Sequence, residues 1–512
     1  MEKRHHKKNR PAYLHVRNFK MYIGRTLNYL KHNGVRSTVK KISERLYYKK
    51  ASLKYIKEHK LSDHSYELQS DQVKGKDTLI SICVPLYNPK PNHLRQMLDS
   101  VMFQSYGNWE LCIADGSDKD TGYSKKIITD CDDERIKYHK LDKNHGISGN
   151  SNLAVKYASG NYIVMLDQDD CLSLDALYEI KAAMSTNADI IYSDEASFIK
   201  NKNKPEIINF KGNFSIYNLR GSNFICHLCC FKKALFLAVG GFRSEFDGSQ
   251  DHDLLLRMSE KTKRFTHIPK VLYYWRMHKG SVASGINAKP YVVEAGLNAV
   301  KENIALSGYN ALVTPISSDV PVYRVKYIHN FKPVIIKDFS KIEEIEDEYI
   351  IVLKKGVKLS KKAVDELCGY LTQQDVGVVG ALLVSDKKIQ SAGLTINTGT
   401  IRNVCHGYDR KSDGYMHTLK YAHNVTAVGE SCFAVRRSVV KRLGGFDLTL
   451  NGDERIIDFC LRLREFGYSV IINPYARAKT TVPKELELSK HFKSKWVRKL
   501  AKKDKWLRDE IY

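Results

Sequence analysis

Residues 161–170 read NYIVMLDQDD, a short apolar run that passes directly into Asp167, Asp169 and Asp170. An apolar run of this length predicts a buried β-strand. Open α/β sheets bind ligands at the carboxyl ends of their strands, so these carboxylates are candidate site residues. Two carboxylates separated by one residue suit a divalent cation, but aspartates in this position also cap helices, and the pattern alone is weak evidence.

Similar apolar runs that end in polar residues occur on either side of this segment, beginning at Thr78. Strand-like runs such as TLISICVPLYN (78–88) and WELCIA (109–114) alternate with helical patterns such as HLRQMLDSVMFQ (93–104). This alternation predicts βαβ units and a mainly parallel sheet, with polar clusters at the strand ends. Asp115 follows one such strand, in ADGSD.

Two later segments add candidate polar groups. Asp251 begins a predicted helix in GSQDHDLLLRM (248–258), where the helix dipole favours a carboxylate. Capping is the alternative for Asp251 and also for Asp253. The basic loop RMHKGSVASG (276–285) follows a strand and could close over phosphates or bring an imidazole to a metal.

In their order along the chain, seven segments resemble the signatures of the GT-A domain of family 2 glycosyltransferases. They are VPLYN (84–88), ADGSD (114–118), NHGISGNSNLA (144–154), MLDQDD (165–170), GGF (240–242), GSQDHDLLLR (248–257) and RMHKGS (276–281). The resemblance covers about 200 residues. It implies an α/β fold of the Rossmann-like GT-A type.

The resemblance also implies a role for each matching residue. Asp115 would read the nucleotide base, Asp167 the ribose or a metal-bound phosphate, and Asp251 would be the general base of an inverting displacement. Gln250 stands where the family often has Glu, which removes one charge. The other implied contacts to the nucleotide sugar are Pro85, Tyr87, Asn88, Asn150, Arg276 and Ser281. The implied ligands of Mn²⁺ or Mg²⁺ are Asp169, with Asp170 in support, and His278.

A second unit beginning near residue 331 repeats part of the first, because 424–468 follows the same order of features as 222–258. Lys354 and Lys355 stand where the acidic cluster should be, and Ile456 aligns with Asp251. We expect this unit to lack the opening strand and the nucleotide-reading aspartate. It is interpreted as a catalytically inactive copy, retained for acceptor binding or for packing.

The net charge of +26, from 83 Lys and Arg against 57 Asp and Glu, is concentrated at the two ends. Residues 1–60 contribute about +15 and residues 490–508 about +8. We expect four segments: a basic helical extension (1–75), a catalytic domain (76–330), a degenerate copy (331–483) and a basic amphipathic helix (484–512). The last places Phe492, Trp496 and Leu500 on one face, which fits either an anionic membrane surface or packing on the chain's own domain.

Other features narrow the class of protein. The sequence has neither an apolar run of membrane-spanning length nor a secretory signal, so a cytoplasmic location, peripheral on the inner face of the membrane, is expected. The 11 cysteines are interpreted as reduced core thiols, because they are scattered and often lie inside apolar runs. Cys226, Cys229 and Cys230 cluster, but a zinc site needs a second Cys or His pair, and none is evident.

The resulting hypothesis is an inverting, metal-dependent glycosyltransferase of bacterial surface polysaccharide synthesis. It would move a sugar from a UDP- or dTDP-sugar to a hydroxyl of a polyprenyl-lipid-linked glycan. The alternative is a non-catalytic carbohydrate-binding or nucleic-acid-binding protein with the same fold. We expect no specific nucleic-acid partner.

Overall fold

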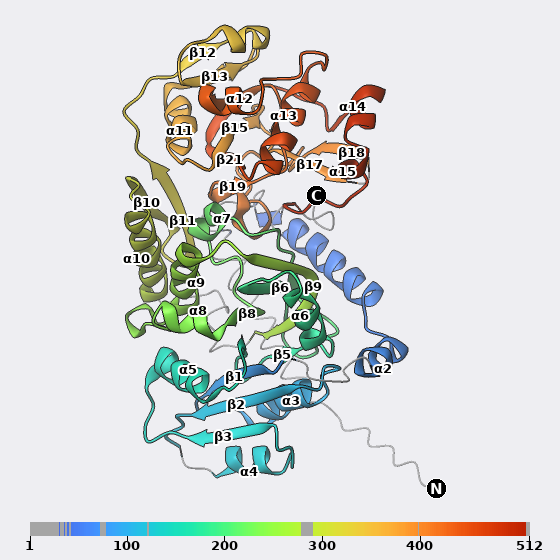
Figure 1. Cartoon of the computed structure of the whole chain (residues 1–512), viewed down its shortest axis with the longest axis vertical. Helices are drawn as coiled ribbons and strands as arrows, with labels where there is room; N and C mark the ends of the chain where they lie inside the picture. The colour runs from blue at the N-terminus through green and yellow to red at the C-terminus, as the bar shows by residue number, and fades with distance from the viewer. Residues whose placement is uncertain are drawn as a thin grey trace.

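The computed structural model describes residues 42–71, 78–119, 122–277, 290–397 and 399–507, with Leu30, Val35, Thr38 and Val39. Two mixed α/β units lie end to end along the long axis, the first below and the second above (Figure 1). Each has its own large sheet, which confirms the predicted α/β class.

The first unit contains a nine-stranded sheet with the order β3-β2-β1-β4-β8-β6-β9-β5, and β7 pairs with β6. Its strands are β1 (Ile80–Leu86), β2 (Trp109–Asp115), β3 (Ile136–Lys140), β4 (Tyr162–Met165), β5 (Cys171–Leu172), β6 (Ile190–Phe198), β7 (Ile207–Asn209), β8 (Cys229–Lys232) and β9 (Phe265–Arg276). Every residue of β1 and β2 is buried. Parallel strands covered on both faces read as continuous apolar runs, which is why the sequence shows no alternation there.

The helices of this unit follow its strands and cover the sheet. They are α3 (Pro91–Met102), α4 (Tyr123–Thr129), α5 (Gly146–Tyr157), α6 (Ala176–Met184), α7 (Ile216–Gly221), α8 (Lys233–Ala238), η1 (Ser244–Phe246), α9 (Gln250–Lys261) and α10 (Pro290–Leu306). A hairpin of β10 (Ala311–Ser317) and β11 (Val320–Tyr327) then leads to the second unit.

The second unit contains an eight-stranded sheet with the order β12-β13-β20-β15-β21-β14, in which β16 also pairs with β15 and β19 with β21, and a separate three-stranded sheet β17-β18-β22. Its elements are β12 (Val334–Ile336), η3 (Phe339–Glu344), β13 (Tyr349–Leu353), β14 (Lys358–Leu359), α11 (Lys361–Leu371), β15 (Val376–Val384), β16 (Ile389–Ser391), β17 (Leu394–Asn397), β18 (Thr400–Asn403), η4 (Tyr415–Lys420), β19 (His423–Asn424), β20 (Cys432–Arg436), α12 (Arg437–Arg442), α13 (Asp453–Glu465), β21 (Ser469–Lys479) and β22 (Glu485–Leu486).

The two large sheets are copies of one topology. The order β12-β13-β20-β15-β21-β14 repeats β1-β4-β8-β6-β9-β5, and every neighbouring pair has the same direction in both sheets. Strands β2 and β3 have no counterpart among the described residues of the second sheet. The expectation that the second unit lacks the opening strand was wrong, because the three-residue strand β12 occupies that place.

A repeated side-chain arrangement supports the same correspondence. Arg257 on α9 pairs with Asp253 and donates to the carbonyls of Val239 and Gly241. In the second unit Arg462 on α13 pairs with Asp458 and donates to the carbonyls of Leu443 and Gly445. Both arginines therefore tie a helix to the turn that carries the Gly-Gly-Phe sequence.

The C-terminal segment forms two short helices, α14 (Lys490–Lys495) and α15 (Val497–Leu500), and not one continuous helix. Phe492, Trp496 and Leu500 are buried in the core of the second unit. The Trp496 Nε1–H donates to Asp458 Oδ1 at 3.0 Å. The expectation that these apolar side chains face a membrane was therefore wrong. The alternative, packing on the chain's own domain, is confirmed.

Near the N-terminus, residues 42–58 are helical and α2 (Asp63–Asp71) follows. Lys49 forms an ion pair with Glu206 at 2.9 Å, and Ser52 Oγ accepts the Ile208 N–H at 3.0 Å, so this helix packs beside β7. Of the helices described, none is long and apolar enough to cross a membrane.

Candidate functional site

Side-chain hydrogen bonds join the loops that follow β1, β2 and β4. The Tyr87 N–H donates to Gln168 Oε1 at 2.8 Å, and Gln168 Nε2 donates back to the Tyr87 carbonyl at 3.1 Å. On the other side, the Asn88 N–H donates to Ser117 Oγ and its Nδ2 to Asp118 Oδ1. Strand β1 lies between β2 and β4, so the predicted polar clusters meet at one edge of the sheet. Pro85 lies in β1 just before these loops and is buried.

Asp115 ends β2 and is held in a fixed orientation. Tyr138 Oη donates to Asp115 Oδ2 at 2.6 Å, and the Ser117 N–H donates to Asp115 Oδ1 at 2.8 Å. Lys140 Nζ lies 3.7 Å from Asp115 Oδ1. The carboxyl group is buried and is held by Tyr138 and Lys140 of the neighbouring strand, β3, and by the main chain of Ser117.

Asn150 on α5 comes close to the loop that follows Asp115. Its Oδ1 accepts the His145 N–H and its Nδ2 donates to Asn144 Oδ1, both at 3.0 Å. A Cβ at Gly116 would lie 2.7 Å from Asn150 Nδ2, so only glycine lets the Asp115 loop approach α5 this closely. Asn150 thus fixes the entry to α5 beside Asp115.

Arg276 and Asp170 join the end of β9 to the loop that follows β4. Asp170 Oδ1 accepts the Arg276 N–H at 2.6 Å, and its Oδ2 accepts Tyr273 Oη–H at 2.7 Å. The Arg276 guanidinium donates to the Asp169 carbonyl and to Gln96 Oε1, and it is 4% exposed. These contacts favour a structural role for both residues, which differs from the expected nucleotide contact of Arg276 and metal ligation by Asp170.

Asp167 and Asp169 are the acidic groups left to face solvent at the end of β4. The Asp167 side chain is 45% exposed and Asp169 is partly exposed. No cluster of three metal-ligating side chains occurs within the described ranges, and His278 and Ser281 fall outside them. A nucleotide-bound Mg²⁺ or Mn²⁺ needs only one or two protein carboxylates besides phosphate oxygens, so these residues fit such an ion.

Asp251 stands in the first turn of α9 without a hydrogen-bond or ion-pair partner among the described residues. Burial raises its pKa to about 6; Asp167 also raises it, whereas His227 lowers it. The neighbouring Asp253 differs, because it pairs with both Arg243 and Arg257. Asp253 is therefore structural, whereas Asp251 is available for proton transfer.

Several residues around the site were not predicted. Tyr138, Gln168 and Asp118 position the loops through the hydrogen bonds described above, and His227 lies beside Asp167 with Nε2 3.9 Å from Oδ2. Gln168 lies within the quoted aspartate motif, so its loop position was visible in the sequence. His227 lies in the cysteine-containing segment FICHLCCF, which is not one of the seven motifs, so the sequence carried no signal for a role of this residue.

The thiols of that segment are free and inaccessible. Cys229 and Cys230 are buried, Cys226 is partly buried, and none of the 11 cysteines is in a disulfide. Burial raises the pKa of Cys229 to about 12. These groups therefore behave as core thiols.

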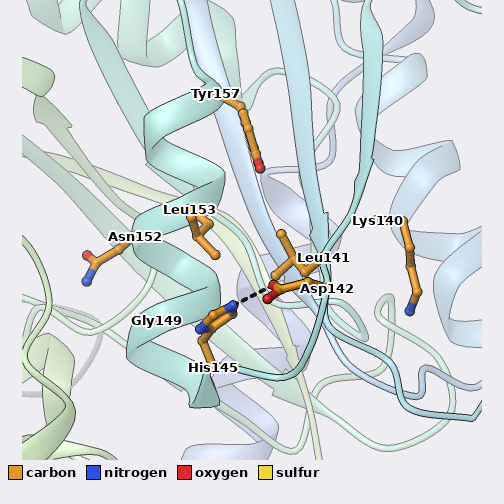
Figure 2. A pocket seen from close by; sticks show the side chains of 8 residues that line it. All are labelled: Lys140, Leu141, Asp142, His145, Gly149, Asn152, Leu153 and Tyr157. Carbon is orange, nitrogen blue, oxygen red and sulfur yellow. Dashed lines mark hydrogen bonds and ion pairs between the residues drawn. The ribbon is translucent and has the colours of Figure 1, made fainter.

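A cavity of about 500 Å³ lies beside α5 (Figure 2). In this view His145 points toward Asp142, and the two side chains are 3.0 Å apart. Lys140 borders the cavity and also approaches Asp115. The cavity is therefore adjacent to the part of the candidate site that contains Asp115.

In the second unit the corresponding positions carry different groups. Tyr162 pairs with Lys232 across β4 and β8, as Tyr349 pairs with Arg436 across β13 and β20. Asp167 lies five residues beyond Tyr162, and Lys354 lies five beyond Tyr349. Lys354 forms an ion pair with Glu430, and Ile456 at the place of Asp251 is fully buried.

Residues 81–239 match the family described as Glycosyl transferase family 2. An uncharacterized protein y4gI of Sinorhizobium fredii is 31% identical over 481 residues, covering 78% of this chain and 52% of that protein. The O-antigen biosynthesis protein RfbC of Myxococcus xanthus is 24% identical, covering 78% of this chain and 37% of that protein. The chain thus spans about half the length of these relatives, or less.

A shorter match is to an Escherichia coli protein. It is named UDP-Glc:alpha-D-GlcNAc-diphosphoundecaprenol beta-1,3-glucosyltransferase WfgD and is 34% identical over 119 residues, covering 23% of this chain and 46% of that protein. Among solved structures, S. aureus TarS 1–349 in complex with UDP-GlcNAc is 18% identical with a TM-score of 0.37, covering 44% of this chain and 66% of that one.

Proposed function

Because the chain carries a glycosyltransferase family 2 domain, we propose that it transfers a sugar from a nucleotide-sugar donor to a hydroxyl of a cell-surface polysaccharide acceptor. The observation that carries this proposal is the Asp251 carboxyl, which has no hydrogen-bond or ion-pair partner among the residues that the structure describes and interacts electrostatically with Asp167 at the carboxyl end of β4. A carboxyl group without such a partner, in electrostatic contact with the acidic cluster, can accept the proton of an attacking hydroxyl.

Asp251 is the proposed general base. A sugar hydroxyl is a poor nucleophile, and a carboxylate within hydrogen-bond reach accepts its proton as the new bond forms. A pKa of about 6 leaves Asp251 mostly ionised at neutral pH while making it a stronger base than an ordinary aspartate. A single base opposite the leaving nucleotide gives one displacement, and hence inversion at the anomeric carbon.

The donor binds along the joined loops in this proposal. Asp115 and Asn150 recognise the base, Tyr87 and Asn88 line the nucleotide, and Asp167 contacts the ribose or a phosphate. Asp169, with Asp167 beside it, would hold Mn²⁺ or Mg²⁺, which supplies charge stabilisation to the leaving diphosphate. UDP-hexoses, UDP-N-acetylhexosamines and dTDP-rhamnose remain the candidate donors.

The acceptor is proposed from the relatives. One is named for O-antigen biosynthesis and another for transfer to a diphosphoundecaprenol-linked sugar. A lipid-linked glycan at the inner face of the cell membrane fits both names. The exposed lysines of α14 and α15 would face its anionic surface, although their apolar side is occupied by the core.

The second unit is proposed to be catalytically inactive. Lys354, Ser431 and Ile456 stand where a donor site would need acidic and polar groups, and no equivalent of Asp115 exists among its described strands. Several side chains join it to the first unit, including Tyr217 Oη, which donates to Asp375 Oδ1 at 2.5 Å. It therefore serves as a packed support or an acceptor-binding surface.

The test is a transfer assay with the full chain, Mn²⁺ and a panel of UDP-glucose, UDP-N-acetylglucosamine and dTDP-rhamnose. The proposal expects turnover of one donor, and loss of that turnover in Asp251→Asn with donor binding retained. The matched control is Asp453→Asn, an aspartate in the first turn of the corresponding helix α13. Equal loss in both variants would contradict the assignment of the site to the first unit.

A further inference from the structure

His227 places an imidazole close to Asp167 and within electrostatic reach of Asp251. It lies just before β8, its ring stacks on Tyr273 with centroids 4.7 Å apart and planes 12° apart, and its Nε2 is 3.9 Å from Asp167 Oδ2. It also interacts electrostatically with Asp251. The 3.9 Å separation is longer than a hydrogen bond, so Asp167 does not satisfy the ring nitrogen directly.

A buried ion pair fixes the main chain of His227. Lys211, whose side chain is fully buried, donates from Nζ to the carbonyls of Ile225 and His227. Lys211 Nζ also lies 3.6 Å from Glu195 Oε2, which accepts the His227 N–H at 3.2 Å. Burying a lysine and a glutamate is costly, so their use on the backbone of the short segment 225–227 indicates that the position of His227 matters.

The internal repeat provides an independent comparison. Counting back five residues from Lys232 reaches His227, and counting back five from its counterpart Arg436 reaches Ser431. The second unit keeps the framework pair of Arg462 with Asp458 but replaces Asp167, His227 and Asp251 with Lys354, Ser431 and Ile456. The second unit therefore lacks His227 together with the two acids, Asp167 and Asp251, although it keeps the framework pair.

We propose that the His227 imidazole hydrogen-bonds a hydroxyl of the sugar being transferred, holding that sugar between Asp167 and Asp251. This inference rests on the proposed sugar transfer and adds a substrate-contacting residue that the sequence motifs do not contain. Imidazole carries both a donor and an acceptor position, so it can bind a hydroxyl in either direction. Contact with the sugar, and not the nucleotide, distinguishes this role from that of Asp115.

The experiment compares binding of a nucleotide sugar with binding of its nucleotide alone. Affinities for UDP and UDP-N-acetylglucosamine, for UDP and UDP-glucose, and for dTDP and dTDP-rhamnose are measured by calorimetry with Mn²⁺, for the full-length wild type and His227→Ala. The inference expects the nucleotide affinity to stay within about twofold. It also expects the sugar-dependent gain in affinity to fall roughly tenfold, as for loss of one buried hydrogen bond.

Two further variants keep the test informative. His227→Gln retains a hydrogen-bonding side chain of similar reach and should recover part of the gain, and it substitutes for the alanine variant if that one does not fold. His406→Ala in the second unit, whose Nδ1 lies 3.0 Å from the Gln390 carbonyl oxygen, should change neither affinity. Where a donor is turned over, kcat/KM should fall at least 30-fold in His227→Ala.

Two results would overturn the inference: an unchanged sugar-dependent gain in His227→Ala, or a parallel loss of nucleotide affinity. Failure of the wild type to transfer any sugar would instead count against the proposed function. The binding comparison needs no turnover, so the two failures are distinguishable.

Discussion

Lys354 in the second unit corresponds in position to Asp167 in the first. Each lies five residues past a tyrosine that pairs with the corresponding neighbouring strand, β20 or β8. A cation at this place repels a divalent metal and pairs instead with Glu430. The two units thus share a framework but carry opposite charge where the donor diphosphate would lie.

This charge reversal predicts an asymmetric response to mutation. Asp167→Asn should lower transfer at least 30-fold, because it removes an acidic group at the donor site. Lys354→Ala should change transfer less than twofold and stability by less than about 1 kcal/mol, since the Lys354 side chain is 57% exposed and solvent screens its charge. Initial rates and thermal unfolding of both variants measure these effects, and a large loss of transfer in Lys354→Ala would show that the second unit takes part in the chemistry.

The raised pKa of Asp251 predicts both a pH profile and a stability change. Transfer should fall as the pH drops through about 6, because the base becomes protonated. Burial disfavours the ionised carboxyl in the folded state, so above pH 6 this group reduces stability, and that penalty disappears as the pH falls. Asp251→Asn should therefore be about 1–3 kcal/mol more stable than the wild type at pH 7, as measured by denaturant unfolding. A less stable variant would contradict the buried, unpaired state of the carboxyl.

Glu110 on β2 predicts the opposite pH dependence. Burial tends to raise its pKa, but hydrogen bonds from Lys137, Ser81 and the Ser159 N–H lower it to about 2. A lowered folded-state pKa contributes stability that is present above the ordinary value of 4.5 and is lost as the pH falls toward 2. Glu110→Gln should cost about 1–3 kcal/mol at pH 7. The difference from the wild type should shrink below pH 4, and a constant difference would rule out this linkage.

Packing of the C-terminal helices predicts that their apolar residues affect stability. Phe492 is fully buried in the second core, so Phe492→Ala should destabilise the fold by about 3–5 kcal/mol. Val497→Ala is the control, because this side chain is 60% exposed and its loss should cost less than about 0.5 kcal/mol. Denaturant unfolding distinguishes the two, and equal small effects would return this segment to the membrane-facing interpretation.

Much of the fold and the site was predictable because each motif follows a strand or opens a helix. Continuous apolar runs predicted β1, β2 and β4. The order of polar clusters predicted Asp115, Asp167 and Asp251 as candidate site residues. The repeat was visible in the Gly-Gly-Phe turn and the following helix. These features depend on local sequence, which periodicity and motif spacing report directly.

Other features depend on contacts that no local pattern contains. The roles of Arg276 and Asp170 follow from their meeting across β9 and the β4 loop, and His227 gains its place from a lysine and a glutamate far away in the sequence. The same amphipathic pattern at 490–500 serves a bilayer or a protein core equally well, and only tertiary packing decided between them. Strand β12 was missed because three residues carry too little periodicity.

The most direct measurement is the initial rate of sugar transfer from the active donor to a lipid-linked glycan acceptor, with Mn²⁺, for wild type, Asp251→Asn and Asp453→Asn. The account predicts that Asp251→Asn retains less than a tenth of the wild-type rate with donor affinity unchanged. Asp453→Asn should keep at least half of the rate. Retention of more than a tenth of the rate by Asp251→Asn, with the donor still bound, would contradict the central claim that this carboxyl is the base.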